Sequence, residues 1–174
     1  MAPYERYAIE VSPEFKKKRI PIARFLCRKR RKTFSLLPIQ LIPYFQYTVN
    51  AVMGTLLLGM HCWQRGQRGF YGAWVKLDEV DPDHLVTPWL IACWLAAVIQ
   101  GFRRGHAALR QFYPLDSIQT SGTWKEAAAY FAAFGLRPMI DGLSLLMDFV
   151  YRYSRRTNQF LFGTPSQYRI SSRA

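Results

Sequence analysis

This chain of 174 residues has few cysteines, and its N-terminus lacks the apolar core of a secretory signal peptide. Its three cysteines, Cys27, Cys62 and Cys93, are too few and too scattered for the disulfide framework of a small secreted protein. The N-terminal residues 1–11 contain no apolar run of the kind that a secretory signal requires. We therefore expect a reducing, cytoplasmic location.

Motifs for catalysis are also absent from the sequence. It contains no nucleotide-binding glycine loop, no nucleophile elbow and no HExxH pair. A metal-dependent nuclease would need three carboxylates that converge on a divalent cation, and the acids here are isolated or lie in expected loops. We expect no enzymatic activity, and we expect His84 and His106 to be surface or capping residues.

Acidic residues are few, and this imbalance of charge is the strongest feature of the composition. The chain has 24 Lys and Arg against 11 Asp and Glu, a formal net charge of +13. Residues 1–33 hold 11 basic and 3 acidic residues, residues 103–174 hold 10 and 4, and the apolar middle is almost neutral. A basic head and a basic tail indicate a polyanionic partner, either nucleic acid or an anionic membrane surface.

The first 27 residues show the alternation expected of β-strands. Tyr7, Ile9 and Val11 alternate with other residues, the basic run Lys16–Arg19 interrupts the pattern, and residues 20–27 resume it. This order predicts a β-hairpin with Lys16–Arg19 at its turn. The second basic run, residues 28–32, follows at once, and no acid lies between the two runs. We expect both runs to form one basic face that contacts phosphates; the alternative is a solvated charged edge that prevents aggregation.

Helices are predicted for most of the remaining chain, which is rich enough in apolar residues to form a core. The apolar spacing between Tyr47 and Trp63 is helical, and Thr87 followed by Pro88 is typical of a helix start. The expected helices span residues 47–63, 88 to about 113, 124–134 and 138–150. We expect four parts: a ribbon-like basic hairpin over 1–38, a helical (helix-turn-helix-like) region over 39–113, C-terminal helices over 114–155 and a basic tail over 156–174. The composition changes near Ser154, and we expect the chain from there to the end to be mobile.

The segment from Arg24 to Pro38, RFLCRKRRKTFSLLP, resembles the end of the transposon-associated zinc ribbons of bacteria. In that family the motif Arg-x-Cys-x-x-Cys-x-Arg-Thr-Phe-Ser is followed by a Leu-Leu-Pro linker into a helix-turn-helix. The resemblance covers about residues 4–60, and more loosely the helices up to about residue 112. It implies an α+β protein in which a zinc-ribbon-like β-hairpin precedes a mostly helical, helix-turn-helix-like region. It also implies a DNA-binding module of mobile-element, transposase-related origin.

The chain departs from that family at the metal ligands. A tetrahedral zinc site needs four ligands, commonly from two cysteine pairs. Cys27 occupies one ligand position, but Arg30 stands where its partner would be, and no cysteine pair precedes the hairpin. His61 and Cys62 are adjacent in an expected helix and point to different faces. We expect a metal-depleted hairpin, with Cys27 as a remnant ligand position and no zinc or other cofactor.

The candidate nucleic-acid-binding residues are the two basic runs and three arginines at the end of the expected helix over 88–113. That helix is apolar and offers few side chains that can hydrogen-bond to base edges, so we expect a buried core helix. Its arginine end is the part that we expect to contact the DNA backbone. The expected partner is DNA, with a transposase or another protein as a second partner. The candidate residues are Lys16, Lys17, Lys18, Arg19, Arg28, Lys29, Arg30, Arg31, Lys32, Arg103, Arg104 and Arg110.

A membrane-associated protein is the alternative interpretation. Residues 34–64 and 85–102 are the longest apolar segments, and about 18 or more apolar residues can span a bilayer. Basic residues flank both segments on their outer sides, which is typical of cytoplasmic ends. Two features oppose this interpretation: the second segment is only just long enough, and polar residues and prolines interrupt the first, namely Pro38, Gln40, Pro43, Gln46, Asn50 and His61.

Overall fold

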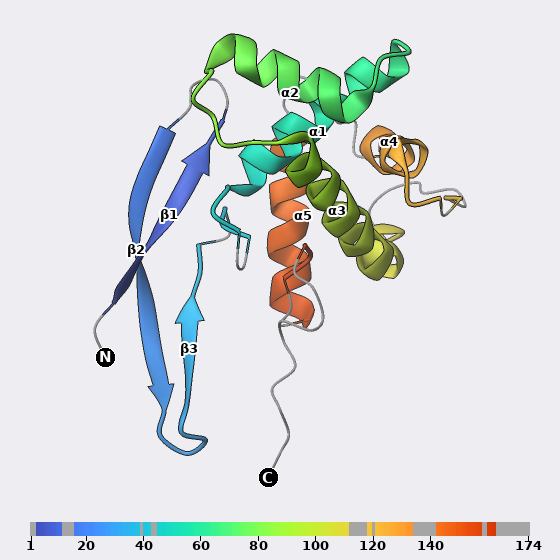
Figure 1. Cartoon of the computed structure of the whole chain (residues 1–174). Helices are drawn as coiled ribbons and strands as arrows, with labels where there is room; N and C mark the ends of the chain where they lie inside the picture. Colours follow the sequence, from blue (N-terminus) through green and yellow to red (C-terminus); the bar gives the residue numbers. More distant parts are fainter. Residues whose placement is uncertain are drawn as a thin grey trace.

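A computed structural model of the chain describes residues 3–11, 16–38, 40–42, 45–111, 118–119, 121–133, 142–157 and 160–162. It contains a three-stranded antiparallel sheet followed by five helices (Figure 1). The predicted α+β class is therefore confirmed. The helices form the body of the molecule, and the sheet lies along one side of it (Figure 1).

The central strand of the sheet exchanges its partner halfway along its length. The strands are β1 (Tyr4–Glu10), β2 (Lys16–Cys27) and β3 (Lys32–Leu36), in the order β1-β2-β3. β1 pairs with β2 only as far as Ile22, and β3 pairs with β2 only from Ala23 onward. Each half of β2 thus has one partner, which explains why a proline is tolerated at position 21 although it cannot donate a hydrogen bond to a neighbour.

The predicted hairpin differs from the observed one in the position of its basic run. Lys16–Arg19 is not the turn but the first part of β2, and residues 12–15, which connect the strands, lie outside the described residues. The run is stable as a strand because β1 supplies partners for its charges. Arg19 lies opposite Tyr7 and donates a hydrogen bond to the Tyr7 hydroxyl at 3.0 Å, and the Glu5 carboxylate lies 3.5 Å from the same guanidinium.

The five helices are consistent with most of the predicted ranges. They are α1 (Val49–Gln64), α2 (Gly69–Val80), α3 (Pro88–Leu109), α4 (Trp124–Ala133) and α5 (Gly142–Thr157). Only α2 was not predicted. Three residues at helical spacing, Gly69, Ala73 and Leu77, are its buried positions, and the first two are too small to give a strong apolar pattern. The expected start of the last helix at Pro138 or Asp141 lies outside the described residues.

Two threonine caps fix where α1 and α3 begin. The Thr87 hydroxyl accepts a hydrogen bond from the backbone N–H of Leu90, with Pro88 in the first helical position, as predicted. Thr48 caps α1 in the same way through the N–H of Ala51. Its hydroxyl also donates to the carboxylate of Glu10 at the end of β1, so this cap joins the sheet to the helices.

One hydrophobic core includes residues from β1 and from all five helices. Small residues let the helices pack closely. A Cβ atom on Gly59 would lie 2.6 Å from the Trp124 ring, and one on Gly101 would lie 2.5 Å from the carbonyl oxygen of Leu161. The expected mobile tail is therefore wrong for its first part, because α5 continues to Thr157 and Leu161 is fully buried beside α3. No helix in the described part of the chain has the length and apolarity to cross a membrane.

Candidate nucleic-acid interface

An arm projects from the molecule beyond β1. We define the arm as residues 23–36, which comprise the second half of β2, the turn at residues 28–31, and β3. Figure 1 shows that it extends past the helices, with its turn at the far end. Most of its side chains are exposed, on both faces of the two strands. A ligand therefore has access to most of the arm's surface.

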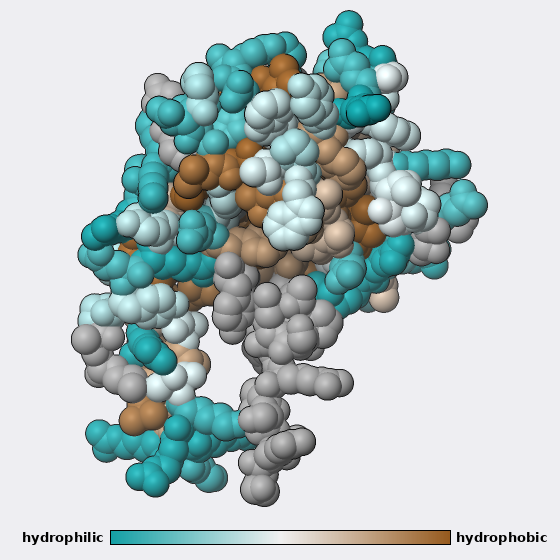
Figure 2. All heavy atoms as spheres, in the orientation of Figure 1, coloured by the Kyte–Doolittle hydropathy of each residue, from teal (hydrophilic) through white to brown (hydrophobic). Residues whose placement is uncertain are grey.

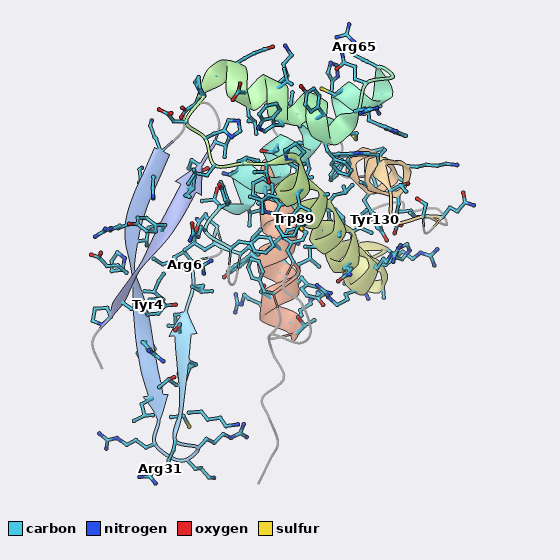
Figure 3. The ribbon with its side chains drawn as sticks, in the orientation of Figure 1. Tyr4, Arg6, Arg31, Arg65, Trp89 and Tyr130 are labelled. Carbon is cyan, nitrogen blue, oxygen red and sulfur yellow. The ribbon has the colours of Figure 1, made fainter. Side chains whose placement is uncertain are left out.

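The base of the arm is firmly attached to the helical body. On its outer edge β1 bonds to the segment before α1, where the N–H of Ile9 donates to the carbonyl of Gln46 and the N–H of Thr48 donates to the carbonyl of Ile9. The Arg6 guanidinium donates to the carbonyl of Ile42 at 2.7 Å, and burial lowers the pKa of Arg6. Arg6 lies between the sheet and the helices (Figure 3). β1 thus holds the first half of β2 against the body and supports the arm.

The tip of the arm carries the second basic run, Arg28–Lys32, and every residue of the run is exposed. Four of its residues form the turn, and Lys32 begins β3. Arg31 has φ of 49°, in the left-handed region that favours glycine or asparagine. It points away from the molecule at the extreme end of the arm (Figure 3). A cationic side chain therefore occupies a position where the backbone conformation favours glycine.

The two faces of the arm differ in chemistry. Because side chains alternate along a strand, one face carries Ala23, Phe25 and Cys27 of β2 together with Phe34 and Leu36 of β3, and Lys32 at its tip end. Phe25 and Phe34 lie directly opposite each other and their rings stack, with centroids 5.4 Å apart and planes at 19°. Phe25 is 44% exposed and Phe34 is 52% exposed, so the stacked pair remains open to solvent.

The opposite face of the arm is more polar. Arg24 donates a hydrogen bond to the Thr33 hydroxyl at 3.1 Å, and Ser35 lies beside them. Leu26 is its exposed apolar residue. Figure 2 shows the hydrophilic tip in teal, with brown and tan hydrophobic surface directly next to it on the arm. Cationic and apolar groups therefore adjoin over a short length of ribbon.

The two basic runs lie at opposite ends of β2 and do not form one continuous patch; whether both contact phosphates stays a prediction. Nine residue steps along β2 and into the turn separate Arg19 from Arg28, which corresponds to about 30 Å. The first run also has its own partners on β1. The Lys17 ammonium lies 4.4 Å from the centroid of the Tyr7 ring, and the hydrogen bond from Arg19 lowers the pKa of Tyr7. Of the two runs, only the one at the tip combines clustered cations with an exposed aromatic surface.

The three candidate arginines of α3 have different surroundings. Arg103 donates two hydrogen bonds of 2.8 Å to Glu126 of α4, through Nε and one terminal nitrogen. Arg104 donates to the carbonyl of Leu161 at 2.9 Å. Arg110, at the end of α3, is exposed. The first two stabilise the packing of the helical body, and the helix α3 lies apart from the arm (Figure 1).

Glu126 is the most strongly perturbed carboxyl group among the described residues. Its side chain is fully buried, whereas that of Arg103 is 41% exposed. The backbone N–H groups of Ser121 and Gly122 donate to the same carboxylate, each at 2.7 Å. The hydrogen bonds from Arg103 and from these backbone groups together lower the pKa of Glu126 to about 2. This cluster fixes α4 against α3 and has a structural role.

The histidines and cysteines do not gather into a cation site. No group of three or more metal-binding side chains occurs within the described residues. His84 is buried and its Nδ1 accepts from the N–H of Val86, so it is not a surface residue, and His106 is within hydrogen-bond distance of the Tyr130 hydroxyl, at 3.2 Å. Cys27 lies at the end of β2, while Cys62 is buried in α1. The expected absence of zinc stays a prediction.

The aromatic pair of the arm was missed from the sequence. Residues 33–37 follow the basic run directly and precede two prolines, Pro38 and Pro43, so they suggest a linker and not a third strand. The available signal was the alternation of Phe34 and Leu36 with polar Thr33 and Ser35 after a short cationic segment. Recognition of that pattern would have predicted the second hairpin.

Comparison of the chain with models of known protein families, with curated proteins and with solved structures finds no match. The resemblance to transposon-associated ribbons therefore depends on the residues around Cys27 alone.

Proposed function

We propose that the protein binds DNA and that the tip of the arm supplies the main phosphate contacts. The observation that carries this proposal is the exposed cluster Arg28–Lys32 at the end of a projecting two-stranded ribbon that contains no acid. Phosphate contacts from lysine and arginine supply most of the affinity of non-specific DNA binding. A narrow ribbon is also one of the elements that enter the grooves of DNA.

The position of the tip favours DNA contact over a purely solvating role for these charges. A charged edge that only prevents aggregation needs no left-handed arginine and no attachment that holds a ribbon clear of the body. Five neighbouring cations also repel one another, and a polyanion relieves that repulsion. The run Lys16–Arg19, about 30 Å away, is a secondary contact in this proposal.

A salt titration with two matched variants tests the proposal. The tip variant R28Q/K29Q/R30Q and the control K16Q/K17Q/K18Q each remove three charges from opposite ends of β2. Removing one cation that binds a phosphate reduces the slope of log affinity against log salt by about 0.9 on duplex DNA. We expect a slope shallower by about 2 to 3 in the tip variant and a clearly smaller change in the control. Equal changes of slope in the two variants would show that total charge, and not the arm, governs binding.

Peripheral binding to an anionic membrane is the second candidate function. The exposed apolar face of the arm beside a cationic tip favours it, since interfacial segments combine apolar and basic residues. Vesicles with and without anionic lipid, sedimented with the protein, test this candidate. Co-sedimentation that the tip variant abolishes, together with no DNA binding at about 50 mM salt, would replace the DNA proposal with the membrane one.

A further inference from the structure

We propose that the arm prefers single-stranded DNA and that unpaired bases stack on Phe25 and Phe34. The inference depends on the proposed DNA binding and identifies the form of nucleic acid that the arm recognises. It follows from three features of the described residues: the chemistry of the apolar face, the exposure of its rings, and the distance from these rings to the tip cations.

The apolar face of the arm cannot read base edges. Apart from Lys32 at its tip end, its side chains are those of Ala23, Phe25, Cys27, Phe34 and Leu36, and sequence readout in a groove of duplex DNA requires several well-placed hydrogen-bond donors and acceptors. Aromatic rings instead interact with the flat faces of bases. In a duplex those faces are covered by the neighbouring bases, whereas in a single strand they are available for stacking. The face is therefore suited to unpaired bases.

The two rings stack on each other and remain partly open to solvent. They lie nearly parallel, at 19°, with centroids 5.4 Å apart, so each ring covers one face of the other and the outer side of the pair is the part on which a base can stack. About half of each ring-bearing residue is exposed, and no packing partner other than the opposite ring appears among the described aromatic contacts of this pair. In the helical body, by contrast, Phe102 and Phe131 are fully buried. Exposure of two adjacent phenylalanines to water is unfavourable unless a ligand covers them.

The tip cations lie close to the two rings, so one nucleotide strand can contact both. Lys32 and Phe34 are two residues apart on the same face of β3, which corresponds to about 7 Å. Arg28–Arg31 continue the positive charge beyond Lys32. A positively charged track next to exposed aromatic rings is the combination that single-strand binding proteins use, with phosphates on the track and bases on the rings.

Intercalation into a duplex is the competing use of the same rings. An apolar wedge can enter a base step, but it must first separate stacked base pairs, which costs a few kcal/mol per step. A single strand requires no such separation. The arm therefore stacks more readily with a single strand than with a duplex at the same salt concentration.

The test compares the two forms of DNA with three variants of the full chain. The probes are a fluorescein-labelled oligothymidylate and a mixed-sequence duplex, each about 16 nucleotides or base pairs long, at about 50 mM salt. F25L/F34L removes the aromatic rings and keeps apolar side chains, and F25Y/F34Y restores the rings. W89L is the control, because Trp89 is 74% exposed but lies in α3, outside the arm. Thermal unfolding of each variant verifies that the fold is retained.

We expect the wild type to bind the single strand at least about tenfold more tightly than the duplex. F25L/F34L should lose that preference with an unchanged salt slope, while F25Y/F34Y and W89L keep it. Equal affinity for both forms, or an F25L/F34L variant that binds the single strand as well as wild type, would overturn the inference and leave the proposed DNA binding intact. A duplex preference that depends on the rings would indicate intercalation and also overturn it. Failure to bind either probe would overturn the proposed function itself.

Discussion

The arm and the helical body use the same kinds of residue in opposite ways. In the body, phenylalanines pack inward, as Phe102 does against the rings of Tyr130, Phe131 and Phe162. In the arm, Phe25 and Phe34 stack on each other and face solvent. Arginines differ likewise, since Arg103 bonds a buried carboxylate while Arg31 extends into solvent. The contrast teaches that residue type alone does not separate a core from an interface; the partners that surround it do.

The largest expected effect is on the core of the body. Phe102→Ala should lower the free energy of unfolding by about 3 to 5 kcal/mol, because it leaves a cavity among buried aromatic residues. Phe34→Ala should lower it by at most about 1 kcal/mol, since the ring stacks on a single cross-strand partner. Urea unfolding of both variants measures the difference. Similar decreases would mean that the arm is part of the core, and the comparison between the two regions would fail.

The next largest effect concerns the buried ion pair of the body. Glu126→Gln should destabilise the fold by about 2 to 3 kcal/mol at neutral pH, because Arg103 and two backbone N–H groups lose a charged acceptor. Lys76→Gln, which removes an exposed pair with Glu79, is the control and should cost less than about 0.5 kcal/mol. DNA affinity of the folded E126Q protein should equal that of wild type, and a weaker affinity would connect the cluster to the interface.

The same carboxylate predicts how stability depends on pH. Its pKa is about 2 in the folded protein and 4.5 ordinarily, so its ionisation stabilises the fold above pH 4.5. That contribution is lost as pH falls from about 4.5 toward 2, where the unfolded chain takes up the proton first. The difference in stability between wild type and E126Q should therefore shrink over this range. Urea unfolding at several pH values measures this difference. A difference that stays constant between pH 4.5 and 2 would contradict the conclusion that the charge of Glu126 stabilises the fold.

The smallest expected effect on stability is at the tip of the arm, where one substitution should change stability and DNA binding in opposite directions. Arg31→Gly removes a left-handed arginine and should stabilise the fold by up to about 1 kcal/mol, because glycine adopts positive φ without strain. The same change removes one cation and should reduce the salt slope of DNA binding by about 0.9. Arg24→Gly, in the strand next to the tip, is the contrast, since it should weaken the strand. A decrease of both the free energy of unfolding and the DNA affinity in R31G would contradict this prediction.

Much of the helical body could be predicted from the sequence, because local signals and tertiary packing agree there. Thr87 and Pro88 specify the start of α3, and the apolar spacing after Tyr47 specifies α1. The helix α2 could not be predicted, since its buried positions include the small residues Gly69 and Ala73. The small size of Gly69 matters only because Gly59 of α1 and the Trp124 ring pack against it. Its contribution is visible in three dimensions alone.

The candidate interface was predicted in composition but not in arrangement. The cations Arg28–Lys32 were identified from their clustering, and the structure puts them at an exposed tip. Their separation from Lys16–Arg19 depends on where the turns occur. The sequence of that run does not show that it pairs with β1, where Arg19 contacts Glu5 and Tyr7. Arg103 was chosen for its charge, and only the fold brings Glu126 to it from 23 residues along the chain.

Because β2 pairs with β1 in its first half and with β3 in its second half, we expect the two halves to differ in local stability. The amides of its first half that bond to β1 belong to a sheet that continues into the segment before α1, so they exchange with solvent only when a large part of the fold opens. The amides of its second half bond only to β3, and they can open whenever the arm frays. Native-state hydrogen exchange along β2 should therefore show a step in protection between Ile22 and Ala23. We therefore expect the strands of the arm to separate and pair again while the body remains folded, so that a ligand can change the shape of the arm without unfolding the core.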